Sequence, residues 1–186
     1  MTLHHTPRPA PGPAPASGAS HVLRPVPFDH PDAVKLNDEV QLEYAERYKQ
    51  DGESEGDVTP LDATMFAHPL GLYLIAYDDG GRAVASGGWR SQDANGEGYA
   101  DGDAELKRMY VIPEARGLGL ARTILAALEE DARAAGRTRM VLETGIRQPE
   151  AIALYESTGY TPAPQKFGHY RDYENSRCFA KPLSRP

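Results

Sequence analysis

Residues 103–123 read DAELKRMYVIPEARGLGLART, and they join a strand-like run to a glycine turn and the start of a helix. The run 104–111 predicts a strand, which Pro113 ends. Gly117 and Gly119 follow, and an apolar helical pattern begins there. Glycines at the start of a helix let a ligand approach the backbone closely, and the unpaired N–H groups and the helix dipole favour an anion. The stretch therefore predicts a turn that holds a pyrophosphate.

The composition fits one soluble globular domain. The 186 residues carry a net charge of −7 and contain no basic cluster of useful length, so no nucleic-acid partner is expected. The single cysteine, Cys178, cannot form an internal disulfide, which fits a reducing compartment. No apolar run approaches the roughly 20 residues that span a bilayer, and the N-terminus lacks an apolar signal segment. We therefore expect a cytoplasmic protein without membrane contact.

The chain divides into a tail and one domain. Residues 1–20 are rich in proline, alanine and glycine and contain little to bury, so they are predicted to be disordered. His4 and His5 lie in this tail, which supplies no fixed geometry for a metal, and no metal site is predicted. Residues 21–186 form the single predicted domain.

Hydrophobic patterns over residues 21–186 predict a mixed α/β (α+β) domain. Strands are expected at residues 21–26, 71–77, 82–90, 104–111, 139–144, 160–164 and 175–181. Helices are expected at residues 31–50, 117–135 and 149–158, with a helical turn at 61–66. The strand–helix–strand order over 104–144 predicts a parallel strand pair joined by a right-handed crossover.

Three kinds of anion-binding turn compete for residues 116–122. A P-loop requires the string GxxxxGK[ST], which the chain does not contain. A Rossmann fingerprint requires a third glycine where Arg122 stands, although Glu143 lies where a ribose-binding acid would be. The string RGLGLA, from Arg116 to Ala121, matches a third pattern, (Q/R)xxGx(G/A).

The third pattern resembles the cofactor signature of the general N-acetyltransferase (GNAT) superfamily. Residues 109–113 are similar to the fourth strand of that family, and residues 148–160 to its fourth helix and the glycine–aromatic pair behind it. The resemblance implies the GNAT fold, a mixed and mostly antiparallel sheet of about six or seven strands, splayed between strands 4 and 5 and flanked by about four helices. It also implies an acyltransferase of the N-acetyltransferase type.

The same resemblance implies a donor and a set of residues that bind it. The donor is acetyl-CoA, with coenzyme A as product and no metal. The pantetheine arm would follow the backbone of Met109 and Val111, and the pyrophosphate would rest on the glycine turn. The implied cofactor-binding residues are Met109, Tyr110, Val111, Arg116, Gly117, Leu118, Gly119, Leu120, Ala121, Arg122 and Gln148. For the two arginines, a solvated helix start is the structural alternative.

Two side chains are implied to be catalytic. Tyr155 stands where the family commonly has a tyrosine that protonates the departing thiolate, and packing in the core is the alternative. Glu105 corresponds to the glutamate base of the histone-acetylating branch, and a structural salt bridge is the alternative. Glu143 is the second choice for a base. Many relatives use ordered water, so a dedicated base is not required. The oxyanion donor would be a backbone N–H near Tyr110 or Val111.

The acceptor is predicted only as a primary amine, on a small molecule or a peptide. Acidic residues between positions 38 and 57 would attract a cationic amine or form a solvated face. Trp89, Tyr170 and Tyr173 would form an aromatic wall or pack elsewhere. A homodimer is a further expectation from the family. Two alternatives remain open, an acyl-CoA-binding sensor without turnover and an acyltransferase that uses another acyl-CoA.

Overall fold

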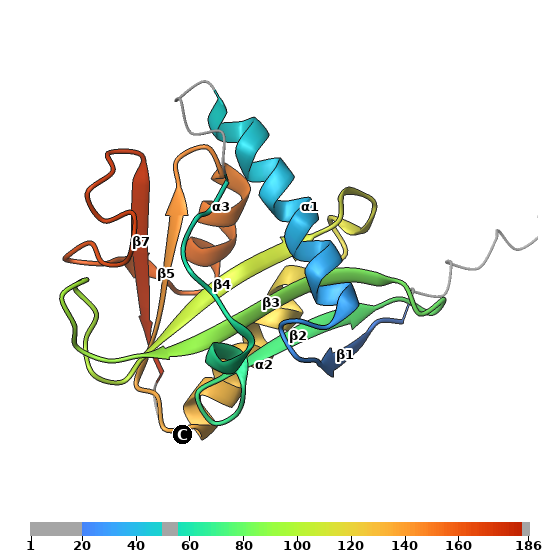
Figure 1. Ribbon diagram of the computed structural model, residues 1–186, viewed down its shortest axis with the longest axis horizontal. Coiled ribbons are helices and arrows are strands. Elements are labelled where there is room, and N and C mark those ends of the chain that lie inside the picture. Colours follow the sequence, from blue (N-terminus) through green and yellow to red (C-terminus); the bar gives the residue numbers. More distant parts are fainter. Residues whose placement is uncertain (1–19, 50–55, 184–186) are drawn as a thin grey trace, which may run out of the picture.

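A computed structural model describes residues 20–49 and 56–183. They form a seven-stranded sheet in the order β1-β2-β3-β4-β5-β7-β6 (Figure 1). The strands are β1 (Val22–Pro25), β2 (Gly71–Tyr77), β3 (Ala83–Gln92), β4 (Asp103–Val111), β5 (Arg139–Gly145), β6 (Thr161–Pro162) and β7 (Ser176–Pro182). Every neighbouring pair is antiparallel except β4 and β5, which are parallel. The prediction of a mixed, mostly antiparallel sheet is therefore confirmed.

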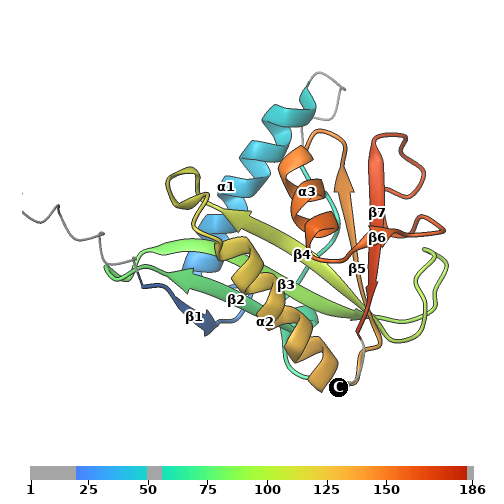
Figure 2. The ribbon, with the colours of Figure 1, turned by 180° about the vertical axis from the view of Figure 1, so that it is seen from behind.

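The helices cover both faces of this sheet. They are α1 (Pro31–Tyr48), α2 (Leu120–Ala134) and α3 (Pro149–Ser157), with short 3-10 turns η2 (Ala63–Phe66) and η3 (Pro113–Ala115). The described residues thus contain three α-helices, where about four were predicted. Figures 1 and 2 place α1 on one face and α2 on the other. Within the described residues, no helix is both long and apolar enough to cross a membrane.

Some predicted boundaries differ from the structure. Helix α2 begins at Leu120 rather than at Gly117, because Gly117 and Gly119 have φ angles of +81° and +79°, outside the right-handed helical region. The strand predicted at residues 160–164 is reduced to the two residues of β6. The predicted tail, apart from Ser20, and most of the acidic loop that precedes Asp57 lie outside the described residues.

Strands β4 and β5 pair only at one end. The ladder between them joins Asp103–Glu105 to Arg139–Val141 and includes no later pair of described residues. The register of β4 against β3 shifts near Arg108, whose φ angle is +57°, which marks a β-bulge that turns β4. Figure 1 shows the two strands diverging toward α1 and α3. The predicted splay between the fourth and fifth strands is confirmed.

Candidate active site

Two adjoining cavities lie where β4 and β5 diverge. The large cavity, about 540 Å³, is enclosed by α1, the end of β4, the turn before α2, and α3. The small cavity, about 120 Å³, is enclosed by β4, β5, α1 and α3 and by chain near residues 57 and 170. Both cavities are lined by Tyr44, Met109, Gln148, Ala151 and Tyr155. These shared residues mark the junction at which a ligand in one cavity would meet a ligand in the other.

The turn before α2 presents backbone to the large cavity. Gly119 is the N-cap of this 15-residue helix, and no side chain caps it. A Cβ atom added to Gly117 or Gly119 would meet no atom of the described residues within 4 Å, so the space above both glycines is open in this part of the chain. The N–H groups of the first helical turn and the positive end of the helix dipole favour an anion there. The local geometry fits a phosphate group.

Two arginines flank this turn. Arg116 donates from Nε to the carbonyl oxygen of Val111 at 3.0 Å, and its Nη2 lies 2.6 Å from Oε2 of Glu43. Arg122 donates from Nη2 to Oγ of Ser157 at 2.6 Å. Both arginines also line the large cavity. Each therefore offers positive charge to a bound anion while an internal partner holds its side chain.

All the cofactor-binding residues implied by the resemblance line the large cavity except Leu118, whose side chain is 58% exposed. Gln148 lines both cavities, and its Nε2 donates to the hydroxyl of Tyr48 at 3.4 Å. Tyr48 packs directly over Gly145, where an added Cβ atom would overlap its hydroxyl group. The glycine at the end of β5 thus lets α1 close over the cavities.

Tyr155 is a core residue that also faces the cavity junction. It is 5% exposed, and its ring lies edge-on to that of Tyr160 with 5.5 Å between centroids. Burial raises the pKa of its hydroxyl well above the ordinary range, so the group keeps its proton at neutral pH. No hydrogen bond to this hydroxyl occurs among the described residues. Both interpretations of Tyr155, core aromatic and site residue, apply to its position.

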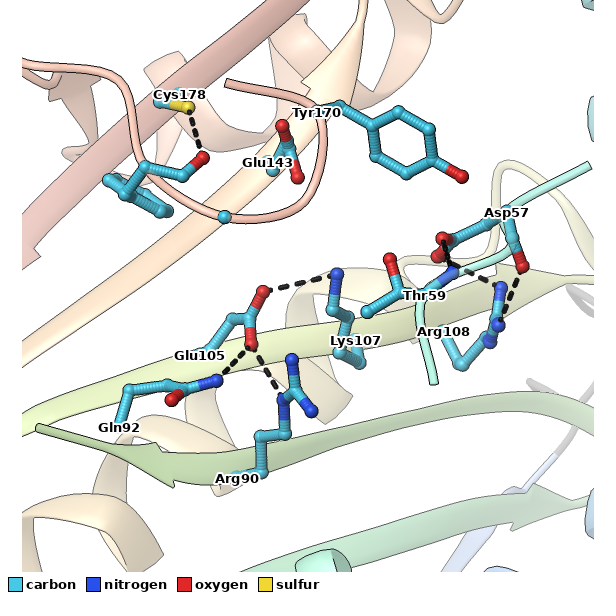
Figure 3. A network of polar contacts seen from close by, with 12 residues as sticks. Asp57, Thr59, Arg90, Gln92, Glu105, Lys107, Arg108, Glu143, Tyr170 and Cys178 are labelled. Carbon is cyan, nitrogen blue, oxygen red and sulfur yellow. Dashed lines mark hydrogen bonds and ion pairs between the residues drawn. The ribbon is translucent and has the colours of Figure 1, made fainter. Parts of the chain in front are cut away.

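Glu105 is fully buried and its two oxygens are occupied (Figure 3). Oε2 accepts from Arg90 at 2.7 Å and from Gln92 at 3.0 Å. Oε1 accepts from Tyr99 at 2.8 Å and lies 3.1 Å from Nζ of Lys107. Burial alone would raise its pKa, but Lys107, Arg90 and the hydrogen bonds outweigh burial and lower it. Glu105 lines neither cavity, and its geometry is that of the salt bridge considered as the alternative.

Glu143 differs from Glu105 in all these respects. It lines the small cavity, and Ser176 donates to its Oε1 at 2.8 Å. Its Oε2 is buried and has no hydrogen-bond partner among the described residues. Burial raises the pKa of this carboxyl to about 7, although Lys107 and Ser176 oppose the shift. Gly168, with φ +82°, packs beside it, and an added Cβ there would lie 2.9 Å from Oε2. Glu143 can therefore exchange a proton near neutral pH.

A short strap of chain, residues 56–59, closes the small cavity from the α1 side. Asp57 lies 3.1 Å from Nη1 of Arg108, and Gln41 hydrogen-bonds both the carbonyl oxygen and the N–H of Asp57, at 2.7 and 2.9 Å. The N–H of Val58 donates to the hydroxyl of Tyr170 at 2.7 Å. Burial would raise the pKa of Asp57, but Lys107 and Arg108 outweigh it and lower the pKa. The strap is thus pinned to three separate elements.

The strap and the cations of β4 were missed in the sequence. Lys107 and Arg108 are consecutive charges inside a strand that is otherwise expected to be buried, and this pattern was the available signal. Asp57 was considered only as the end of the acidic run that would attract a cationic amine, and its pairing with Arg108 was not predicted. All three residues line the small cavity.

The predicted aromatic wall does not form as a unit. Trp89 is fully buried in the core, where its Nε1 donates to Oδ2 of Asp131 at 2.8 Å. Tyr173 is 44% exposed, and only Tyr170 of the three lines the small cavity. In the part of the chain that the structure describes, no group of three His, Cys, Asp or Glu residues could hold a metal ion. His4 and His5 lie outside that part.

Comparison with known proteins agrees with this geometry. Residues 36–160 match the family model described as acetyltransferase (GNAT) family. The chain is 37% identical over 134 residues to the IAA acetyltransferase of Azospirillum brasilense, covering 69% of this chain and 82% of the relative. It is 26% identical over 131 residues to the aminoglycoside N(6')-acetyltransferase type 1 of Klebsiella aerogenes, covering 70% and 79%.

A solved structure from Klebsiella pneumoniae, described as a candidate acyl-CoA N-acyltransferase, superposes with a TM-score of 0.69. It has 26% sequence identity, and the match covers 88% of this chain and 98% of that one. The relatives are named for different acceptors, so the comparisons agree on the family and not on the substrate. The chain belongs to the GNAT family of acetyltransferases and has the GNAT fold.

Proposed function

We propose that this protein transfers an acetyl group from acetyl-CoA to a primary amine by direct attack. The observation that carries the proposal is the junction of the two cavities at Tyr155. The large cavity has an open glycine turn and two arginines that suit a pyrophosphate, whereas the small cavity has buried acid–base groups. A donor in the first cavity would present its thioester to an acceptor in the second.

In this proposal the donor supplies an activated acetyl group, and the chain binds and orients it. The pyrophosphate contacts the N–H groups of residues 117–122, with charge from Arg116 and Arg122. The backbone of Met109 and Val111 binds the pantetheine arm. A backbone N–H near Tyr110 or Val111, beyond the bulge in β4, stabilises the oxyanion of the tetrahedral intermediate.

We assign the general base to Glu143 rather than to Glu105. The base must take a proton from the amine at neutral pH, which a carboxyl with a pKa of about 7 does efficiently. Glu105 is already neutralised by Arg90 and Lys107 and faces neither cavity. The buried hydroxyl of Tyr155 holds the proton that the departing thiolate requires.

The release of free thiol from acetyl-CoA in the presence of a panel of amines tests this function. We expect release that depends on the amine and saturates with it. Binding of acetyl-CoA without release on any amine would support the acyl-CoA-binding sensor instead. Replacing acetyl-CoA by succinyl-CoA or a longer acyl-CoA tests the third alternative, and faster turnover with such a donor would contradict the choice of acetyl.

A further inference from the structure

The small cavity and the layer behind it contain more buried charge than acetyl transfer to a simple amine requires. Three cations and three carboxyl groups meet there, and they are Arg90, Lys107, Arg108, Asp57, Glu105 and Glu143. Buried charges cost free energy unless each has a partner. The ion pairs within this set therefore indicate which charged groups can still bind a ligand.

Two internal pairs account for four of the charges. Arg108 pairs with Asp57 at 3.1 Å, and Arg90 pairs with Glu105 at 2.7 Å. Among the described residues, the fifth charge, Lys107, forms an ion pair only with Oε1 of Glu105, at 3.1 Å, and that oxygen already accepts from Tyr99. An ammonium group has three donors, so Lys107 keeps donor capacity toward the cavity that it lines.

The sixth charge, Glu143, lies across the cavity from Lys107 (Figure 3). Both groups line the small cavity, and no ion pair joins them among the described residues. Lys107 is only 7% exposed, so water has little access to the donor positions that Glu105 does not occupy. The cavity thus presents one cation and one carboxylate, adjacent and of opposite sign, to whatever enters it.

We propose that the acceptor is a small α-amino acid, with its carboxylate on Lys107 and its amino group at Glu143. The inference rests on the proposed function and names its substrate class. An α-amino acid carries its ammonium group and its carboxylate on the same carbon atom. It therefore matches a cavity whose facing groups have opposite signs. A simple cationic amine would satisfy Glu143 but would leave the remaining donor capacity of Lys107 unused and add positive charge beside it. The volume of about 120 Å³ suits a small molecule.

Among the described acidic residues that were predicted to attract a cationic amine, none offers a free carboxylate to the small cavity. Glu43 contacts Arg47 at 2.7 Å and Arg116 at 2.6 Å, on the side of the large cavity. Asp57 is held by Arg108. This leaves Glu143 as the carboxyl of the small cavity without a cationic ion-pair partner among the described residues.

The proton balance of the step is complete with these groups. Glu143 takes one proton from the ammonium group, and the neutral nitrogen attacks the thioester carbon. The C–S bond breaks as Tyr155 gives its proton to the sulfur, and the second proton lost from the nitrogen restores Tyr155. The products are an N-acetyl amino acid and coenzyme A, and Glu143 releases its proton to solvent.

The test compares matched acceptors on the full-length protein. Glycine, L-alanine and L-serine are each measured against the corresponding amide and decarboxylated amine, with rates expressed per concentration of unprotonated amine. We expect kcat/KM for the acid to exceed that of both partners by about tenfold or more, the value of one charge-assisted hydrogen bond. With coenzyme A bound, the acid and not the decarboxylated amine should raise Tm.

Lys107→Met tests the residue, and Lys181→Met is its matched control. Lys181 pairs with Glu129 at 2.7 Å and lines neither cavity. Lys107→Met should reduce the preference for the acid to within about threefold of the amide, while Lys181→Met should keep it. The comparison of acceptors on the unchanged protein stands even if Lys107→Met does not fold.

Three results would overturn the inference. An amide or decarboxylated amine that equals the acid would remove the carboxylate from recognition, and a better amide would favour peptide N-termini. Turnover confined to other amines would refute the substrate class while leaving the acetyltransferase proposal intact. Thiol release on no amine at all would refute both.

Discussion

The large and small cavities are built in different ways, although they share a junction. The large cavity depends mainly on one contiguous segment, from Met109 to Arg122, and uses backbone N–H groups and exposed arginines. The small cavity draws on α1, the strap at 56–59, β4, β5 and the chain near Tyr170. A ligand site made of contiguous backbone can therefore be predicted from a sequence, whereas a site made of buried charges from distant segments cannot.

The two cavities should also differ in what a mutation costs. Charges at the large cavity are exposed or partly exposed, so the loss of one partner there affects binding more than folding. The two ion pairs at the small cavity and behind it, Arg108–Asp57 and Arg90–Glu105, are largely buried, so the loss of one partner affects the free energy of unfolding as well.

The largest effect is expected from Gly119→Val at the large cavity. Valine at φ +79° is strained, and its side chain would occupy the space for the pyrophosphate. We expect the Kd for acetyl-CoA to rise about 100-fold or more, since contacts to the turn are charge-assisted. Gly136→Val, at φ +83° after the other end of α2, has the same open surroundings and lies outside both cavities. Calorimetry should find normal affinity for acetyl-CoA in that control. Normal affinity in both variants would refute the proposal that the glycine turn binds the pyrophosphate.

The junction is tested by Tyr155→Phe, which removes the buried hydroxyl and keeps the ring. We expect kcat to fall about 100-fold, the usual contribution of a general acid, with little change in the Kd for acetyl-CoA. Tyr160→Phe is the control, because its hydroxyl donates to Glu129 at 2.9 Å outside both cavities. That control should lower Tm but not kcat. Equal activity of Tyr155→Phe and the unchanged protein would remove Tyr155 from the mechanism.

Substitution of the two carboxyl groups of β4 and β5 should affect different properties, catalysis for Glu143 and stability for Glu105. Glu143→Gln should lower kcat/KM about tenfold or more above pH 7 and abolish the decline that the unchanged protein shows as pH falls through about 7. Glu105→Gln leaves Arg90 and Lys107 with less negative charge, and we expect it to destabilise the fold by about 3 kcal/mol. A pH profile that is the same in Glu143→Gln would assign the base elsewhere.

The pKa of Glu143 also predicts a pH dependence of stability. Its folded-state pKa, about 7, exceeds the ordinary value of 4.5, so folding favours the protonated carboxyl. The free energy of unfolding should therefore fall as pH rises from about 4.5 to 7 through this group. Glu143→Gln removes that loss, and at pH 8 it should be more stable than the unchanged protein by about 1–3 kcal/mol. Denaturant unfolding at pH 5 and pH 8 measures the difference, and a destabilised variant at pH 8 would contradict it.

The smallest effect is expected from Tyr170→Phe, which releases the strap over the small cavity. It removes one hydrogen bond, from the N–H of Val58, worth about 1 kcal/mol. We expect KM for the acceptor to rise a few-fold while the Kd for acetyl-CoA stays constant, since Tyr170 does not line the large cavity. Tyr173→Phe, on the exposed neighbour, is the control. A larger effect on acetyl-CoA than on the acceptor would contradict this division of the cavities.

Most of the fold could be predicted because it follows from local patterns. Alternating and continuous apolar runs located every strand. On α1, the four-residue spacing of Leu36, Val40, Tyr44 and Tyr48 predicts one apolar face, and all of these except Tyr44 are buried. Prediction was less accurate at the short edge strand β6 and at the start of α2. Only two residues pair in β6, and a left-handed glycine decides where α2 begins. The hydrophobic pattern carries no information about either feature.

The order of residues alone predicted the strand, glycine turn and helix at the large cavity, because those parts are contiguous and use the backbone. It also predicted the family, which comparison with known proteins confirmed. Only the tertiary structure decided that Glu105 lies buried among cations and that Glu143 has a raised pKa. On β4, the bulge at Arg108 decides where these charges lie. It interrupts the alternation of side chains and lets Lys107 and Arg108 line the same cavity. Strand periodicity would have placed those two cations on opposite faces.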